Sequence, residues 1–324
     1  MKVLVAGDAN LDLVLGGDVV PRFGQAEQLL DSAQLVLGSS AGICASGLAR
    51  LGVDVALVAR VGNDLFGDQT IRLLRDNGVD TTAVLRTDTP TGISVILSAA
   101  DDRAILTLTG AMTELTTSDL LGVLPQPGPT TPEPRTTAPE PDEGHLHVAS
   151  FFLLPGLAEG LPELLAQARA AGLTTSLDTN WDPAERWAGV EACLPHLDVL
   201  LPNAAEAVAI ARSLGTEVAD AEAAARVLAA RGPIVAVKDG PAGGFAVAGD
   251  QLVRAPGLPV EVVDTTGAGD SFDAGFLCAW LAGEDLATAV RWGTVAGSLS
   301  TRGFGGTGGQ PTRDELTAAV AGSG

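Results

Sequence analysis

The chain has 324 residues, of which 46% are hydrophobic, and its 40 acidic against 19 basic residues give a net charge of −21. A chain of this length and composition can build a full hydrophobic core, either as one large α/β domain or as two domains. The negative charge argues against nucleic acid as a partner, because a phosphate backbone is bound by clustered Lys and Arg.

Cysteine usage and hydropathy bear on the compartment. The chain has no run of about 18 apolar residues, so no membrane span is expected. The apolar run that starts at Lys2 is broken at Asp8, which is too early for a signal peptide. The three cysteines show neither metal-binding nor redox spacing. These features predict a cytoplasmic protein with three buried thiols, Cys44, Cys193 and Cys278.

Strand-like and helix-like segments alternate along the chain. Strands are predicted at 3–6, 53–59, 93–98, 105–108, 145–152, 174–177, 199–201, 234–237 and 258–263, and helices at 45–51, 71–77, 161–171, 219–230, 271–281 and 293–301. This alternation predicts a doubly wound α/β fold, with a mostly parallel sheet flanked by helices on both faces. Ligands of such folds collect beyond the carboxyl ends of the strands.

Residues 125–143 are rich in Pro and Thr, and their composition cannot pack a core. We expect this segment to be a disordered surface insertion. It does not separate two domains, because strands and helices alternate on both sides of it. The sequence therefore predicts a single domain over residues 1–324.

The stretch 264–272 (DTTGAGDSF) lies between a strand-like and a helix-like run. A glycine-rich turn that enters a helix presents free backbone N–H groups and the positive end of the helix dipole, which together bind phosphate. Asp270 in the same turn can take a proton from a hydroxyl that attacks phosphorus. Four of these residues alone, Gly-Ala-Gly-Asp, would also fit an ordinary helix entry with Asp as the N-cap.

The full nine-residue string is more specific, and it resembles the C-terminal signature of the ribokinase-like (PfkB) carbohydrate kinases. The resemblance implies that the amides of Gly267, Ala268 and Gly269 form an anion hole, that Asp270 is the catalytic base, and that Thr266 lies beside the nucleotide. A Walker-type phosphate loop is excluded, because the chain has no Gly-x-x-x-x-Gly-Lys-Ser/Thr string.

Two N-terminal motifs concern the phosphate acceptor. Residues 7–12 (GDANLD) place two carboxylates and an amide in one turn, which fits either the hydroxyls of a sugar or solvent. Their similarity to the family's opening motif implies that Asn10 and Asp12 orient the acceptor. Residues 38–45 (GSSAGICA) resemble the family's glycine motif, which assigns Gly38 and Ser39 to the acceptor. Ile43 stands where the family has an Asn, so a sugar contact is missing.

Further strand ends carry polar residues. The resemblance places Asp178 close to the acceptor, whereas Asp182 replaces an Arg of many relatives. It also implies that Asn203 and Glu206 help to place Mg²⁺ through water, although an Asn-x-x-Glu string alone would be a helix start. On the strand that carries His145 and His147, the two rings share a face, and we expect them to be structural.

The nucleotide side is assigned by resemblance alone. It implies that Lys238, Gly240 and Gly303 lie beside ATP, although a surface lysine fits Lys238 equally well. In many relatives the turn that corresponds to Asp264 and Thr265 also holds a monovalent cation. The resemblance therefore allows K⁺ as a further cofactor but does not require it.

The resemblance implies a ribokinase-like fold with a small β-sheet lid, here built from about 11–36 and 85–110, which in many relatives also pairs two subunits. We expect a homodimer that uses ATP and Mg²⁺ to phosphorylate a primary hydroxyl of a neutral sugar, without nucleic-acid or membrane partners. Two alternatives stay open, namely a nucleoside kinase of the same fold and a non-catalytic sugar-binding regulator.

Overall fold

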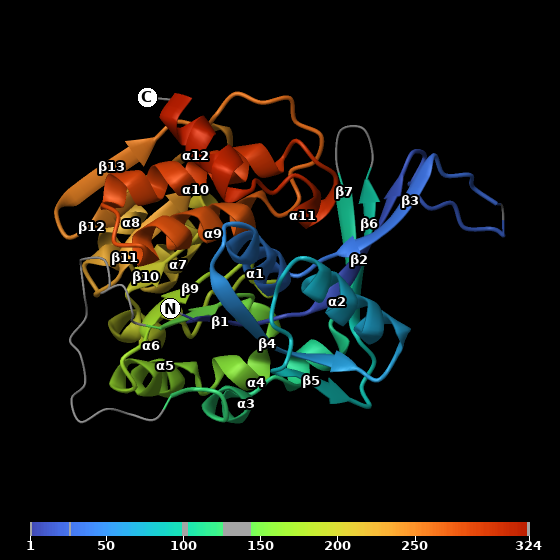
Figure 1. Cartoon of the computed structure of the whole chain (residues 1–324), viewed down its shortest axis with the longest axis horizontal. Coiled ribbons are helices and arrows are strands. Elements are labelled where there is room, and N and C mark those ends of the chain that lie inside the picture. The colour runs from blue at the N-terminus through green and yellow to red at the C-terminus, as the bar shows by residue number, and fades with distance from the viewer. Residues whose placement is uncertain (1, 26, 99–102, 126–143, 323–324) are drawn as a thin grey trace.

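The computed structural model describes residues 2–25, 27–98, 103–125 and 144–322. Residues 126–143, nearly all of the Pro- and Thr-rich segment predicted at 125–143, lie outside the described residues. Figure 1 shows a sheet with helices on both faces and a smaller sheet that projects from one side.

Nine strands of the described chain form the large sheet, in the order β13-β12-β11-β10-β9-β8-β1-β4-β5. The strands from β11 to β5 pair in parallel, whereas β11, β12 and β13 pair antiparallel. The bounds are β1 Lys2–Ala6, β4 Asp54–Gly62, β5 Val84–Thr87, β8 His145–Val148, β9 Thr174–Leu177, β10 Val199–Leu200, β11 Ile234–Lys238, β12 Gly244–Ala248 and β13 Gln251–Ala255.

Helices cover both faces of this sheet, and each face has its own apolar core. The helices on one face are α1 (Ser40–Arg50), α2 (Leu65–Asp76), α9 (Ala268–Leu281), α10 (Leu286–Ser300) and α12 (Arg313–Gly322). Those on the other face are α3 (Thr117–Leu121), α4 (Pro155–Ala158), α5 (Leu161–Ala170), α6 (Val190–Cys193), α7 (Ala204–Ser213) and α8 (Ala221–Ala229). The short α11 (Gly305–Gly308) follows α10, and 3₁₀ turns occur at Gly110–Glu114, Phe151–Leu153, Leu194–His196 and Gly240–Ala242.

The central helix α9 is apolar nearly all round, since Phe272, Phe276, Leu277 and Trp280 are all buried. A helix without a polar face has to lie inside the protein. This burial fixes the position of the first turn of α9, which carries Asp270.

The smaller sheet has the order β3-β2-β6-β7. Its strands β2 and β6 run parallel, and the two outer pairs are antiparallel. It is built from β2 (Asn10–Gly16), β3 (Ser32–Leu37), β6 (Gly92–Ser98) and β7 (Arg103–Leu108). The segments that we expected to form a lid thus supply this sheet, except that β5 joins the large one.

Two predicted strands differ from the structure. Residues 258–263 have no regular structure, because Pro256 and Pro259 lack the N–H groups that a sheet partner would need. The strand predicted at 145–152 ends at Val148, since Ser150 has a left-handed backbone (φ 61°) that starts a 3₁₀ turn. In the described ranges, moreover, no helix combines the length and the apolar character that crossing a membrane requires.

Candidate active site

The turn before α9 is held by Asp264. One carboxylate oxygen accepts the backbone N–H of Thr266 at 2.9 Å and its hydroxyl at 2.7 Å, and the other accepts the N–H of Gly305 at 2.9 Å. Gly267 follows as the N-cap of α9 with φ 72°, a left-handed conformation that favours glycine. The first backbone amides of α9 therefore point out of the helix start, as an anion requires.

Asp270 lies in the first turn of α9 and is 9% exposed. Burial raises its pKa well above the ordinary value; Asp178 raises it further, and Lys238 opposes the shift. Ser40 at the start of α1 hydrogen-bonds to Asp270, and the Ser40 hydroxyl accepts the side-chain amide of Asn180 at 2.7 Å. A buried carboxylate with a raised pKa is a stronger base than an exposed one.

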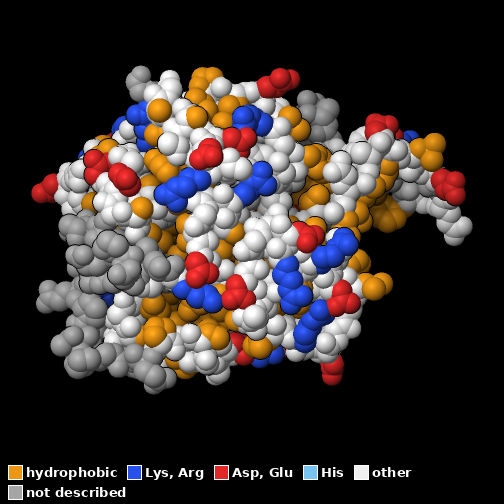
Figure 2. Space-filling view, viewed as in Figure 1, with side chains coloured by type: hydrophobic (Ala, Val, Ile, Leu, Met, Phe, Trp, Pro, Cys, Tyr) orange, Lys and Arg blue, Asp and Glu red, His pale blue; other side chains and the backbone are white. Residues whose placement is uncertain are grey.

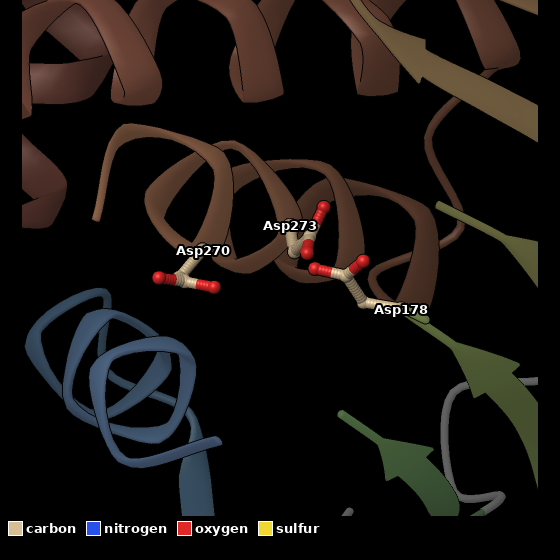
Figure 3. A group of neighbouring side chains, drawn as sticks. All are labelled: Asp178, Asp270 and Asp273. Carbon is tan, nitrogen blue, oxygen red and sulfur yellow. The ribbon is translucent and has the colours of Figure 1, made fainter. Parts of the chain in front are cut away.

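Two more aspartates lie beside Asp270. One carboxylate oxygen of each of Asp178, Asp270 and Asp273 falls within 4.8 Å of those of the other two. Figure 3 shows Asp178 and Asp273 facing each other, with Asp270 one turn earlier on α9 and directed toward α1. Lys238 Nζ lies 2.8 Å from Asp178 and 3.1 Å from Asp273. Sequence reasoning missed Asp273, although its spacing of three from Asp270 puts both on one face of α9.

Several residues predicted to bind the acceptor lie together at the start of β2, a few residues after the end of β1. Asn10 donates its side-chain N–H to Asp12 at 3.2 Å, and both residues are buried. A Cβ on Gly38 would lie 2.2 Å from an Asp12 oxygen, so the Asp12 carboxylate needs a glycine there. Ser39 instead caps α1, with its hydroxyl accepting the N–H of Gly42 at 3.2 Å. Ile43 is 3% exposed and faces Gly306 and Gly267.

The start of α7 forms a capping box. The Asn203 side chain accepts the N–H of Glu206 at 2.9 Å, and the Glu206 carboxylate accepts the N–H of Asn203 at 2.9 Å. Glu206 is 4% exposed, and burial, followed by the charge of Asp178, raises its pKa to about 7. An amide and a carboxylate at this position suit a hydrated Mg²⁺, which keeps several waters and needs few protein ligands.

A cavity of about 400 Å³ opens beside the turn that precedes α9 and reaches Ala268 and Gly269. Its lining includes Lys238 and Gly240, which we expected beside ATP, together with Thr265. Its other walls are mostly apolar or small, and they include residues that sequence reasoning missed: Pro241, Leu258, Pro259, Val260, Val262, Phe272, Thr294 and Ser298.

Some predicted residues have other contacts. Gly303 packs against Gly309, where an added Cβ would lie 2.4 Å from the Gly309 nitrogen. The Asp178 carboxylate faces Lys238. His145 and His147 bond to hydroxyls, His145 to Thr174 at 2.8 Å and both rings to Ser176. These buried contacts fit the structural role that we expected for the two histidines.

Comparison with known proteins shows the family of the chain. Residues 5–313 match the model of the pfkB family carbohydrate kinases. The chain is 31% identical to a ribokinase of Bacillus subtilis over 318 residues, which cover 97% of this chain and 98% of that protein. It is 30% identical to an ATP-dependent ribose-1-phosphate kinase of Halopiger xanaduensis over 325 residues, which cover 99% and 98%.

Among solved structures, a ribokinase from Thermotoga maritima superposes with a TM-score of 0.80 at 25% identity, covering 99% of both chains. The family match spans nearly the whole chain, and the fold is that of ribokinase. These likenesses identify an ATP-dependent carbohydrate kinase. The chain belongs to the pfkB family of carbohydrate kinases.

Proposed function

We propose that this kinase transfers the γ-phosphoryl group of ATP to a primary hydroxyl of a neutral sugar. The observation that carries the proposal is the position of Asp270. It lies in the first turn of α9, whose leading residues Ala268 and Gly269 line the cavity of about 400 Å³. The nucleotide would therefore reach the helix start from the cavity, and the acceptor would reach Asp270 from the side of Asn10 and Asp12.

In this proposal Asp270 accepts the proton of the acceptor hydroxyl as its oxygen attacks phosphorus. The amides of Gly267, Ala268 and Gly269 donate to the oxygens of the phosphoryl group, on which charge develops during transfer. Asn10 and Asp12 hold the acceptor hydroxyls. Asn203 and Glu206 would hold Mg²⁺ through water, and the ion would neutralise charge on the phosphate oxygens.

The charge near Asp270 favours a neutral acceptor. Asp8, Asp178 and Asp273 are all buried beside it. Lys238 is the cationic side chain of this cluster, and it already pairs with two carboxylates. A phosphate on the sugar would be repelled by this arrangement.

A nucleoside acceptor is the second candidate, and Trp181 supports it. Trp181 is 50% exposed and follows Asn180, the residue that bonds Ser40 beside Asp270. Its ring is supported edge-on by Trp187 at 5.0 Å. A half-exposed indole next to the site could stack on a base.

We also propose that two copies pair through the small sheet. Paired residues of neighbouring strands share a face, and one such row is Leu35, Leu13, Val95 and Leu106, all apolar. Figure 2 shows apolar side chains along this projecting sheet.

An ATP-consuming protein whose three cysteines are buried and unpaired fits the expected cytoplasmic location.

The test is ADP release from Mg-ATP across a panel of sugars and nucleosides. Turnover on a neutral sugar would support the first candidate, and turnover confined to nucleosides would support the second. Asp270→Asn should reduce kcat by about 10²- to 10⁴-fold, because it removes the base. Its affinity for a non-hydrolysable ATP analogue should persist. The same assay with K⁺ replaced by a larger cation would show whether Asp264 and Thr265 support a monovalent ion.

The proposal fails if wild-type protein binds no nucleotide and turns over no acceptor in the panel. Nucleotide and sugar binding without turnover would instead support the regulator. If Asp270→Asn kept wild-type kcat, the assignment of the base would be wrong.

A further inference from the structure

Lys238 ends β11 between two carboxylates that come from different parts of the fold. Its ammonium lies 2.8 Å from Asp178, at the end of β9, and 3.1 Å from Asp273 on α9. The three side chains are 11%, 2% and 1% exposed. Burial alone would lower the pKa of Lys238, but Asp178 and Asp273 outweigh it and raise that pKa. The ammonium is therefore a fixed positive charge inside the protein.

The position of this charge is close to the phosphate-binding turn. Lys238 lines the cavity of about 400 Å³ together with Ala268 and Gly269. A Cβ on Gly269 would lie 3.4 Å from Lys238 Cδ and 3.8 Å from Nζ. The ammonium thus lies directly beneath the helix start, between the cavity and the aspartates.

The three aspartates could be taken for a divalent metal site, because their oxygens lie within 4.8 Å of one another. Two of the three already pair with the Lys238 ammonium. A divalent ion would have to displace that ammonium from its buried position. The positive charge of this cluster is therefore supplied by the chain itself.

Asp273 has a specific task in this arrangement. A lysine side chain has a flexible four-carbon stem, so a single partner would leave the ammonium free to move. With Asp178 alone, Lys238 could turn to Asp270, the third carboxylate of the cluster, and neutralise the base. Asp273, one turn beyond Asp270 on α9, faces Asp178 (Figure 3) and gives the ammonium a second carboxylate partner at 3.1 Å.

We propose that Asp273 is a positioning residue, which together with Asp178 fixes the Lys238 ammonium beneath the anion hole, where its charge supports both the ionised Asp270 and the transferred phosphoryl group. This inference rests on the proposed kinase function. It assigns Lys238 an electrostatic role at the site, and it assigns Asp273 a role that acts through Lys238.

The groups around Asp270 decide how the charge of Lys238 affects it. Burial, Asp178 at the end of β9 and Asp8 at the end of β1 raise the pKa of Asp270, whereas Lys238 on β11 and a hydrogen bond from Ser40 lower it. Burial also raises the pKa of Asp273, which shares a hydrogen bond with Asp178. Cys44 of α1 is a buried thiol whose own raised pKa keeps it neutral. Glu206 of α7 interacts with Asp178 and Lys238. Because Lys238 is the cation that lowers this pKa, losing it should leave Asp270 protonated up to a higher pH.

Kinetics of single and double variants test the coupling. Asp273→Asn and Lys238→Met should each lower kcat by at least about 10-fold, and the double variant should fall no further, because Asp273 acts through Lys238. Lys238→Met should also move the acidic limb of the kcat/KM profile to higher pH. Independent losses that multiply in the double variant, or a wild-type kcat in Asp273→Asn, would overturn the proposal.

Asp198→Asn is the matched control for stability. Asp198 is likewise a buried aspartate paired with a cation, Arg169 at 3.3 Å, but it lies beside Thr175, at the other end of β9 from Asp178. It should lower the melting temperature without changing the pH profile. If Asp198→Asn reproduced the kinetic loss of Asp273→Asn, the effect would be general destabilisation and the proposal would fail.

A second measurement needs no turnover. The chain has only two lysines, so ¹⁵N-lysine labelling gives one ammonium signal for Lys238 and one for Lys2, which is half-exposed and paired with Asp80. The Lys238 signal should exchange slowly, shift when a Mg-bound ATP analogue is added, and broaden in Asp273→Asn. The Lys2 signal should not change. A Lys238 signal that neither shifts with nucleotide nor broadens in Asp273→Asn would refute the inference. This result could be read even if no acceptor were phosphorylated in the kinase assay.

Discussion

At the scale of single residues, Gly267 shows how closely the proposed anion hole is packed. An added Cβ would lie 2.7 Å from Gly306 Cα and 3.0 Å from a methyl of Ile43, and the backbone is left-handed (φ 72°). The contact with Gly306 is a backbone contact, which cannot move aside as a flexible side chain can. The turn, the 303–309 loop and Ile43 thus fix one another.

Gly267→Ala should therefore reduce kcat by at least about 10²-fold, since a lost oxyanion donor costs that much or more. The added strain of a left-handed alanine should cost about 1–2 kcal/mol of unfolding free energy. Chemical denaturation and steady-state kinetics of the same preparations would measure both effects.

Gly249→Ala separates strain from function. Gly249 also has positive φ (56°), but an added Cβ there meets nothing within 4 Å. It should lose similar stability and keep its kcat. If Gly267→Ala kept its kcat as well, the 267–269 turn would not be the anion hole.

Some features of the site could be predicted from the sequence, and others could not. The turn 264–270 could be predicted from a local pattern, because glycine conformation and the helix start are properties of neighbouring residues. The contacts of Asp178 could not. Its facing of Lys238 and Asp273 depends on the order β11-β10-β9 and on the position of α9, which no local pattern contains.

At the scale of elements, α7 begins with a capping box that also contains the expected Mg²⁺ residues. Asn203→Ala removes the acceptor for the N–H of Glu206 and should cost about 1 kcal/mol of stability. If the same amide helps to hold Mg²⁺, the Mg²⁺ concentration needed for half-maximal rate should rise several-fold. Titration of Mg²⁺ at saturating ATP would measure this shift.

The neighbouring helix α8 offers the comparison. Its N-cap Asp220 accepts the N–H of Ala223 at 2.8 Å at an exposed position. Asp220→Ala should lose about the same stability and leave the Mg²⁺ dependence unchanged. Equal Mg²⁺ dependence in both variants would leave Asn203 with a capping role only.

The strands and helices that could be predicted are those whose apolar periodicity agrees with their pairing and packing in the fold. The run 258–263 has a strand-like composition, yet it lines the cavity and pairs with no described strand. The hairpin of β12 and β13 was missed, although Gly249-Asp250 is a turn signal between two alternating runs. Pairing partners, which decide both cases, are set by tertiary structure.

At the scale of the whole molecule, charge and apolar surface oppose each other. A net charge of −21 makes copies of the protein repel one another. The small sheet nevertheless exposes a continuous apolar face, on which Leu35, Leu106 and Leu108 are 40%, 60% and 55% exposed. On its other face, Asp12 lies against Gly38, and Val36 lies against Gly305. The apolar face is thus directed away from the site and is available to a second copy.

Leu106→Glu should therefore convert a dimer into monomers, because it buries a charge without a partner in the proposed interface. Salt should have the opposite effect and strengthen the wild-type dimer, since it screens the repulsion between two copies of charge −21. Sedimentation velocity across protein and salt concentrations would measure both trends.

Leu65→Glu is the control, because Leu65 is 84% exposed on α2, outside the small sheet. A wild-type protein that stays monomeric at high concentration and high salt would show that the apolar face does not pair two copies.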